Sequence, residues 1–257
     1  MPRYFLELAY KGTNYSGFQI QENANSIQQE VEKALGIFFR ARFELTGSSR
    51  TDGGVHAVQN FFHFDYEGDI DIRVLYNINA ILPPDIVLIN VYPVAPDAHC
   101  RFDAVSREYR YYIYRVKNPF LADRAWFYPY TLDRGLLKTA AALIPAYQDF
   151  TTFAKRNTQV KTFLCTILES AWEEDEQCLI YRVKANRFLR GMVRGLVGTM
   201  LQVGRGKLSV PAFAEVLEKR NNQLADFSAP GHGLFLHQVS FTVSTPPGPD
   251  ILFVKGM

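Results

Sequence analysis

A glycine-rich segment with a single aspartate, residues 47–57, sets the strongest limit on how this chain can fold. It reads Gly-Ser-Ser-Arg-Thr-Asp-Gly-Gly-Val-His-Ala. Glycine adopts backbone angles that other residues avoid, and an Asp-Gly pair favours a tight turn over the interior of a helix or a strand. The sequence therefore predicts a rigid loop that carries Asp52, with Arg50 close enough in the chain to meet it.

Such a loop can serve chemistry, because an aspartate beside an arginine stays ionised, as a nucleophile requires. The same residues also fit an exposed turn with a surface ion pair, since Asp-Gly turns are common. The spacing of Arg50 and Asp52 leaves both interpretations open. We expect the nearby His56 to brace the loop by hydrogen bonds and not to act as a base.

Hydrophobic patterns on both sides of this loop predict a mixture of helices and strands. Residues 26–29, Ser-Ile-Gln-Gln, form a capping box that starts a helix at residue 27. Further helices are expected at 71–82, 132–144, 188–203 and 210–219. The expected strands are 3–11, 58–65, 86–94, 106–115, 162–173, 179–184 and 234–243.

This order favours an α+β fold with two mixed units that share one sheet. The first unit, 1–105, carries the aspartate loop, and the second, 106–245, carries a basic helix. The proline-containing tail, 246–257, is expected to be extended. With 257 residues, of which 47% are hydrophobic, the chain is long enough to bury a sizeable core.

Cysteine and histidine usage bears on the compartment and on metal binding. The three cysteines lie far apart, and none of the five histidines joins them at zinc-ligand spacing. This pattern predicts free thiols in a reducing compartment and no bound metal. No apolar run is long enough to span a bilayer, and the N-terminus lacks the apolar region of a signal peptide. We therefore expect a cytoplasmic protein without a membrane segment.

The net charge is only +2, but basic residues gather in two places. One is the segment 182–220, and the other is the segment 101–115, where arginines alternate with tyrosines. Positive charge beside aromatic rings is typical of proteins that hold a phosphate backbone, although a solvated sheet face would also fit. On the helix expected at 188–203, Arg187, Arg190 and Arg194 form a basic stripe at positions i, i+3 and i+7. Their like charges repel and need carboxylate or phosphate acceptors.

Six groups of motif residues follow one another along the chain. They are 15–19 (Tyr-Ser-Gly-Phe-Gln), 50–57 (Arg-Thr-Asp-Gly-Gly-Val-His-Ala), 99–102 with 109–111 (His-Cys-Arg-Phe and Tyr-Arg-Tyr), 149–153 (Asp-Phe-Thr-Thr-Phe), 184–189 with 192–194 (Lys-Ala-Asn-Arg-Phe-Leu and Met-Val-Arg), and 233–236 (Gly-Leu-Phe-Leu). In this order they resemble the motifs of the tRNA pseudouridine synthase A family. The resemblance extends over almost the whole chain.

The resemblance implies a fold of two ferredoxin-like, RRM-like halves that share a mostly antiparallel sheet, with the active site in the cleft between them. It implies an isomerase that converts uridine to pseudouridine in the anticodon stem-loop of tRNA, at positions 38, 39 and 40 in tRNA numbering. The target base must leave its stack before it can react. The resemblance also implies a homodimer and a reaction that needs no cofactor.

Matched motif by motif, Asp52 resembles the catalytic aspartate of the family, Tyr109 the tyrosine that stacks on the uracil, and Arg194 the arginine that pairs with the aspartate. Leu234 resembles an apolar pocket residue, and Arg50 is expected to contact RNA or to order the target nucleotide. Without the motifs, Tyr109 would be interpreted as a core residue, and Leu234 would fit plain packing equally well. The residues expected to bind the RNA backbone are Arg107, Arg110, Arg187 and Arg190.

The chain departs from the family pattern at Ser49, Gly53, Gly195 and the Arg190-Gly191 pair. These departures leave the matched catalytic residues in place but affect RNA contacts and the choice of uridine. The alternatives are a related synthase that acts on another tRNA or RNA position and a non-catalytic RNA-binding module of the same fold. A carboxylate-based glycosidase would need a second partnered acid, and the sequence offers no convincing one.

Overall fold

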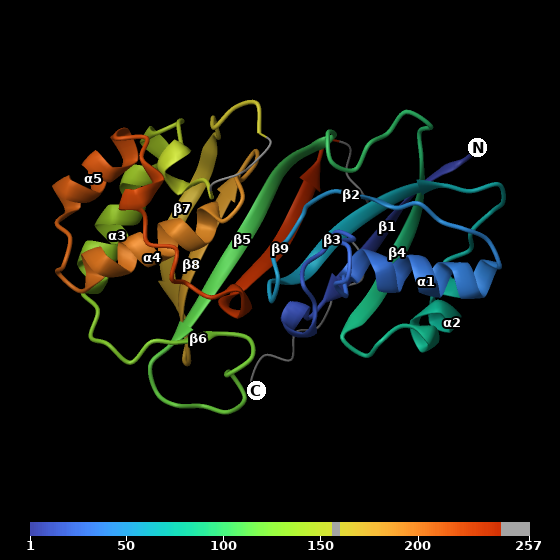
Figure 1. Cartoon of the computed structure of the whole chain (residues 1–257), viewed down its shortest axis with the longest axis horizontal. Coiled ribbons are helices and arrows are strands. Elements are labelled where there is room, and N and C mark those ends of the chain that lie inside the picture. Colours follow the sequence, from blue (N-terminus) through green and yellow to red (C-terminus); the bar gives the residue numbers. More distant parts are fainter. Residues whose placement is uncertain (156–159, 243–257) are drawn as a thin grey trace. The chain divides into compact units, whose positions relative to one another are not determined.

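The chain folds as two α+β units in the computed structural model, which describes residues 1–155 and 160–242 (Figure 1). Unit 1 comprises Met1–Val105 together with the chain from Leu236 on, and unit 2 comprises Ser106–Phe235. The sequence pattern assigns residues up to 245 to the second half, whereas the chain from Leu236 on groups with unit 1. The tail expected at 246–257 lies outside the described residues.

The sheet of unit 1 has the strand order β4-β1-β3-β9. Its strands are β1 (Arg3–Tyr10), β3 (His56–Asp65), β4 (Ile86–Val94) and β9 (Leu234–Phe241), with the two-residue strand β2 (Thr46–Gly47) beside β3. Strand β1 runs antiparallel to both β3 and β4. Large apolar side chains such as Leu8, Phe61 and Phe62 are completely buried, because these strands form the centre of the unit's core.

Two helices, α1 (Ile27–Phe39) and α2 (Val74–Ile81), pack against this sheet and contact each other. Helix α1 begins where the capping box predicts, since the Ser26 hydroxyl accepts a hydrogen bond from the backbone N–H of Gln29 at 3.3 Å. Its buried face consists of Ile27, Val31, Ala34 and Leu35. Figure 1 shows both helices on the same side of the strands.

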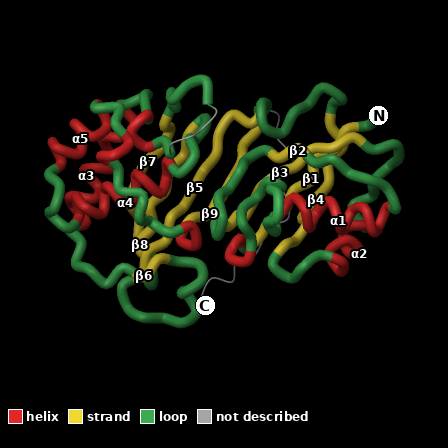
Figure 2. The backbone as a smooth tube through the Cα atoms, viewed as in Figure 1, coloured by secondary structure: helices red, strands yellow, loops and turns green. Residues whose placement is uncertain are grey.

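Unit 2 is built on three antiparallel strands in the order β5-β8-β7. They are β5 (Ala104–Tyr114), β8 (Leu179–Ala185) and β7 (Ile167–Glu174), and the short β6 (Trp126–Phe127) pairs with β5. Its helices are α3 (Arg134–Leu143), α4 (Met192–Gly204) and α5 (Val210–Glu218). Figure 2 shows the long loop that connects β5 to α3 and includes β6. The α+β class and the mostly antiparallel strand pairing predicted from the sequence are confirmed.

The helix predicted at 188–203 begins later, at Met192. Gly191 has a φ of +74°, in the left-handed region, so the backbone before it does not continue the helix. A Cβ atom at this position would also lie 2.8 Å from the side chain of Lys155. The predicted basic stripe of three arginines on one helix is therefore wrong, because Arg187 and Arg190 precede α4 and only Arg194 lies on it.

Candidate functional site

The loop that carries Asp52 is a tight turn pinned to the N-terminal part of unit 1. Gly54 has a φ of +76°, as the glycine pair predicts, and the N–H of Val55 closes the turn on the Asp52 carbonyl at 3.1 Å. Asp52 forms an antiparallel bridge with Gly17, and the N–H of Phe18 donates to the Thr51 carbonyl at 3.1 Å. The half-buried Asp52 is therefore held by its backbone on two sides.

Gly17 allows this close approach. Its φ is +132°, and a Cβ atom there would lie 3.0 Å from the Thr51 carbonyl oxygen. Any larger residue would have to push the two segments apart, because backbone atoms cannot move aside as a flexible side chain can. The first motif, residues 15–19, thus acts structurally as the backbone partner of the aspartate loop.

The prediction that His56 braces the loop is confirmed. Its Nδ1 atom accepts a hydrogen bond from the N–H of Gly12 at 3.0 Å, and the side chain is buried. This bond ties the start of β3 to the 3-10 turn at Gly12–Asn14. The aspartate loop is consequently fixed at its C-terminal end as well.

A buried polar network beneath the loop was not anticipated from the sequence. The Thr51 hydroxyl shares a hydrogen bond of 2.8 Å with the phenol of Tyr10, and Asn60 Nδ2 donates to the Ser49 carbonyl at 2.9 Å and to the Tyr10 phenol at 3.2 Å. Tyr10 ends β1, while Asn60 is a fully buried polar residue in the middle of β3. The sequence signal for this network was a lone asparagine, Asn60, directly before the buried pair Phe61 and Phe62 in β3.

Arg50 does not form the ion pair with Asp52 that its position in the chain allows. Its guanidinium pairs with no carboxylate of the described residues. The Arg50 side chain instead lines a pocket in unit 1. Burial lowers the pKa of Arg50, and the positive charge of Arg101 lowers it further. Arg101 lines the same pocket. Arg50 thus has a second cation, Arg101, beside it in place of the carboxylate of Asp52. Two cations at one pocket favour the binding of an anionic ligand there.

In unit 2, Tyr109 lies on β5 and is only 8% exposed. Its ring meets that of Phe188 edge-on, with 5.1 Å between the ring centroids. Tyr111, two residues further along the same strand face, is completely buried and donates from its hydroxyl to the Pro230 carbonyl at 2.8 Å. Tyr109 is therefore a buried, packed ring and not a freely moving side chain.

Arg194 occupies the first turn of α4, and its Nε donates to the Ala229 carbonyl at 2.5 Å. A positive charge there faces the positive end of the helix dipole, which disfavours it. Burial lowers the pKa of His232, and the charge of Arg194 acts in the same direction. Helix stability alone therefore does not favour an arginine at position 194.

Leu234 is 6% exposed and begins β9, directly after the 3-10 turn Gly231–Gly233. A Cβ atom on Gly233 would lie 2.7 Å from the Tyr111 ring, so this turn packs tightly on that tyrosine. The structure thus brings Arg194, Tyr111 and the segment that leads into Leu234 together within unit 2. Tyr111 is a member of this group that the sequence had not singled out.

The four arginines expected to bind RNA differ in their surroundings. Arg107 donates to the Asn186 carbonyl at 3.0 Å, and Arg110 pairs with the buried Glu108 at 2.9 Å. Arg187 is half-buried and Arg190 is exposed. The positive charge of Arg110 is therefore already balanced by a carboxylate, while Arg190 is the most accessible of the four.

No three histidine, cysteine or acidic side chains gather closely enough to hold a metal ion within residues 1–155 and 160–242. The same part of the chain contains no helix with the length and apolar character needed to cross a membrane. All three cysteines, Cys100, Cys165 and Cys178, are buried and form no disulfide within the described residues.

A family model and several curated proteins match this chain and share one name. Residues 147–242 match the family model described as tRNA pseudouridine synthase. The chain is 48% identical over 243 residues to the tRNA pseudouridine synthase A of Bacteroides fragilis, covering 93% of this chain and 96% of that protein. It is 41% identical to the protein of the same name from Parabacteroides distasonis, over 97% of this chain and all of that one. The identity to the Staphylococcus aureus protein of that name is 38%, over 92% and 90% of the two chains.

Proposed function

The chain belongs to the tRNA pseudouridine synthase A family, and from this premise we propose that it isomerises uridine to pseudouridine at positions 38, 39 and 40 of the tRNA anticodon stem-loop. The observation that carries the proposal is the placement of Asp52. Its motif matches the family's catalytic motif, and its backbone is fixed by the bridge to Gly17 and the turn at Gly54. A fixed backbone restricts where the Asp52 carboxylate can lie, which lowers the cost of aiming it at a substrate atom.

The reaction breaks the bond between N1 of uracil and C1′ of the ribose and forms a bond from C1′ to C5 of the same base. The C5 proton leaves, and N1 gains a proton, so the base keeps its composition and nothing is oxidised. Because the detached base must turn without escaping, the site must enclose it and exclude water. Asp52 is the proposed catalytic residue, either by adding to the sugar or the base or by removing a sugar proton.

Tyr109, Arg194 and Leu234 of unit 2 are the proposed companions of Asp52. Tyr109 would stack on the uracil, Leu234 would line the pocket, and Arg194 would balance the carboxylate's charge. Two features support these roles: Tyr109 is held against Phe188, and Arg194 occupies a helix turn that disfavours a cation.

Arg107, Arg187 and Arg190 are the proposed contacts to the RNA backbone, with a smaller contribution from Arg110 because Glu108 already balances its charge. Such contacts give an affinity that falls as the salt concentration rises. Structured RNA is recognised largely by its shape, and extraction of the base precedes the chemistry. In keeping with the family resemblance, we also propose that the enzyme is a cytoplasmic homodimer that needs no cofactor.

The direct test is to incubate the protein with unmodified tRNAs and to map pseudouridine at nucleotide resolution. Each tRNA should carry a uridine at only one of the positions 38, 39 and 40, so that each conversion is assigned separately. The proposal predicts conversion at these positions and no change in the rest of the stem-loop. Conversion at a different position would favour a related synthase with another target, and no conversion in any tRNA would contradict the proposed activity.

A further inference from the structure

A pocket of about 180 Å³ opens beside the aspartate loop of unit 1. Two of its walls come from residues that the site above already contains: Arg50 of the loop, and Phe18, whose N–H holds the loop at Thr51. Another part of its lining, which we call the second wall, consists of His99, Arg101 and Phe102. This second wall has no role in the function proposed above.

The positive charge of the pocket indicates which kind of ligand it binds. Arg50 and Arg101 both line it, and none of the described residues that form its lining is acidic. The two guanidiniums are close enough for the charge of Arg101 to lower the pKa of Arg50. Two like charges around one cavity repel, and a single anion between them would relieve that repulsion. Guanidinium groups bind phosphate oxygens with well-defined geometry.

The aromatic wall adds a second kind of contact. Phe102 is 73% exposed, although a phenyl ring gains from burial. Its ring packs on His99 with 4.1 Å between the centroids, and the Arg101 guanidinium lies 5.8 Å from its centre. A ring that is held in place while remaining accessible is a platform on which a nucleobase can stack.

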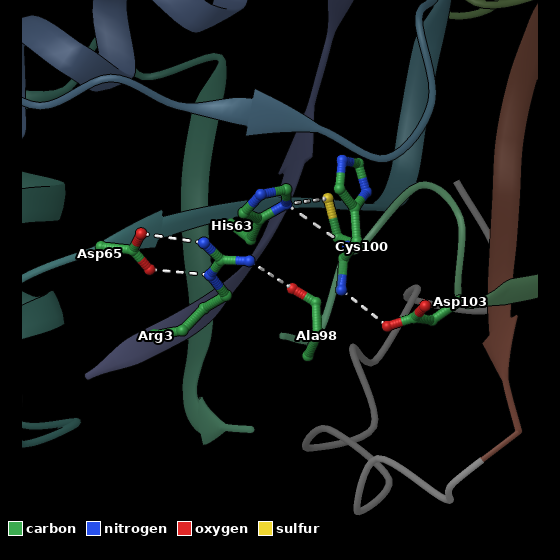
Figure 3. Close-up of polar contacts among 7 residues, drawn as sticks. Arg3, His63, Asp65, Ala98, Cys100 and Asp103 are labelled. Carbon is green, nitrogen blue, oxygen red and sulfur yellow. Dashed lines mark hydrogen bonds and ion pairs between the residues drawn. The ribbon is translucent and has the colours of Figure 1, made fainter. Parts of the chain in front are cut away.

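The turn that presents these side chains is firmly anchored (Figure 3). Arg3 donates to the Ala98 carbonyl at 3.0 Å, and the N–H of His99 donates to Asp103 at 2.6 Å. The buried Cys100 lies between Arg101 and His99, with its sulfur 3.2 Å from His63 Nδ1. Because the turn is fixed before any ligand arrives, binding would not have to order it.

We infer that this pocket binds one nucleotide of the RNA substrate next to the target uridine, with its phosphate between Arg50 and Arg101 and its base on Phe102. This inference rests on the proposed function and adds a subsite to it. The occupant must be close to the target, because Arg50 and Asp52 are two residues apart and their Cα atoms can be separated by at most about 7 Å. The pocket would hold the neighbour while the target uridine is extracted.

Single substitutions on the exposed wall test the subsite without disturbing the fold. In the full-length protein carrying Asp52→Asn, which prevents turnover, binding of unmodified tRNA is measured over a range of salt concentrations. Phe102→Ala should weaken binding about 5-fold or more. Arg101→Gln should weaken binding and lower the slope against salt by about 0.7, whereas Arg101→Lys should keep the slope.

Two matched controls separate the subsite from general surface effects. Phe120 is 76% exposed, so Phe120→Ala removes a comparable ring elsewhere. The Arg42 side chain is 88% exposed and pairs with Glu44, so Arg42→Gln removes a comparable charge of unit 1. Neither control should change the affinity or the salt slope.

A second series identifies the occupant. Anticodon-arm RNAs, each with one abasic residue, are bound to the Asp52→Asn protein with and without Phe102→Ala. At one position beside the target, removing the base should abolish the effect of Phe102→Ala, since both changes remove the same stacking contact. Additive effects at every position would overturn the stacking role.

Failure of the subsite is distinguishable from failure of the proposed function. If the enzyme with intact Asp52 forms pseudouridine while Phe102→Ala and Arg101→Gln bind tRNA like the controls, the subsite is wrong and the function stands. If that enzyme forms no pseudouridine, the proposed function itself fails. If the subsite and the proposed function are both correct, Phe102→Ala and Arg101→Gln should raise KM with little change in kcat. The reason is that the subsite stabilises the bound substrate and the transition state equally.

Discussion

Gly17 and Asp52 pair through their backbones in an isolated antiparallel bridge, so the N-terminal segment and the aspartate loop of unit 1 are fixed to each other. The first sequence motif thereby supports the second, although more than thirty residues separate them. The chain thus fixes the backbone that carries its candidate catalytic carboxylate with main-chain bonds, which do not depend on the rotamers of flexible side chains.

Gly17→Ala should reduce activity strongly. The φ of +132° and the 3.0 Å approach of a Cβ atom to the Thr51 carbonyl would both have to be relieved by moving the loop. We expect a loss of about 1–3 kcal/mol in the free energy of unfolding together with a large fall in kcat. Thermal unfolding and steady-state kinetics on unmodified tRNA measure the two effects.

Gly206→Ala is the matched control. Gly206 also has a positive φ, +68°, but a Cβ atom there meets nothing within 4 Å. This variant should lose about 1–2 kcal/mol of stability from backbone strain and keep its kcat. Equal kinetic damage in both variants would mean that instability, and not displacement of the aspartate loop, limits the activity of Gly17→Ala.

Arg194→Gln should separate activity from stability. Removing a cation from the first turn of α4 favours the helix by about 0.3–1 kcal/mol, which offsets much of the loss of the bond to the Ala229 carbonyl. We expect a melting temperature close to that of the unsubstituted protein and a fall in kcat of about 100-fold. A strongly lowered melting temperature together with an unchanged kcat would assign Arg194 a structural role instead.

The local features of this fold could be predicted from the sequence. The capping box at Ser26 and the bounds of β4 at Ile86–Val94 depend on residues within one turn or one strand. The bracing role of His56 and the turn at Gly54 follow from the same short segment. Such features are set by backbone preference and near neighbours, which a single sequence displays directly.

Features that depend on partners far away in the chain could not be predicted from the sequence. The apolar pattern continues upstream of α4, so only the left-handed conformation of Gly191 reveals that the helix begins at Met192. Likewise, Asn60 of β3 donates to the carbonyl of Ser49 in the aspartate loop, 11 residues away in the chain. The pocket between Arg50 and Arg101 joins two motifs that lie about fifty residues apart in the chain.

Stability should fall as the pH drops from 6.5 toward 4, because of His63. Burial lowers the pKa of His63 from 6.5 to about 4, and the neighbouring His99 and Arg3 lower it too. In this range the unfolded chain takes up a proton that the folded protein excludes, so protonation favours unfolding. Urea unfolding at several pH values measures the change in the free energy of unfolding.

His63→Gln should flatten this dependence. His232, whose pKa is also lowered by burial, contributes a smaller slope of the same sign that His232→Gln would remove. Carboxylates with lowered pKa values, such as Asp65 beside Arg3, act at more acidic pH and are therefore separable. An unchanged slope in the double variant His63→Gln and His232→Gln would contradict this explanation.

The most direct measurement compares the unsubstituted enzyme with Asp52→Asn, which keeps the size and shape of the side chain and removes its charge. Both proteins are incubated with the same unmodified tRNA, and pseudouridine formation and tRNA affinity are measured in parallel. If the Asp52 carboxylate performs the isomerisation, the variant forms no detectable pseudouridine and binds tRNA as tightly as the unsubstituted enzyme. Pseudouridine formation by Asp52→Asn at the rate of the unsubstituted enzyme would show that another residue carries the reaction.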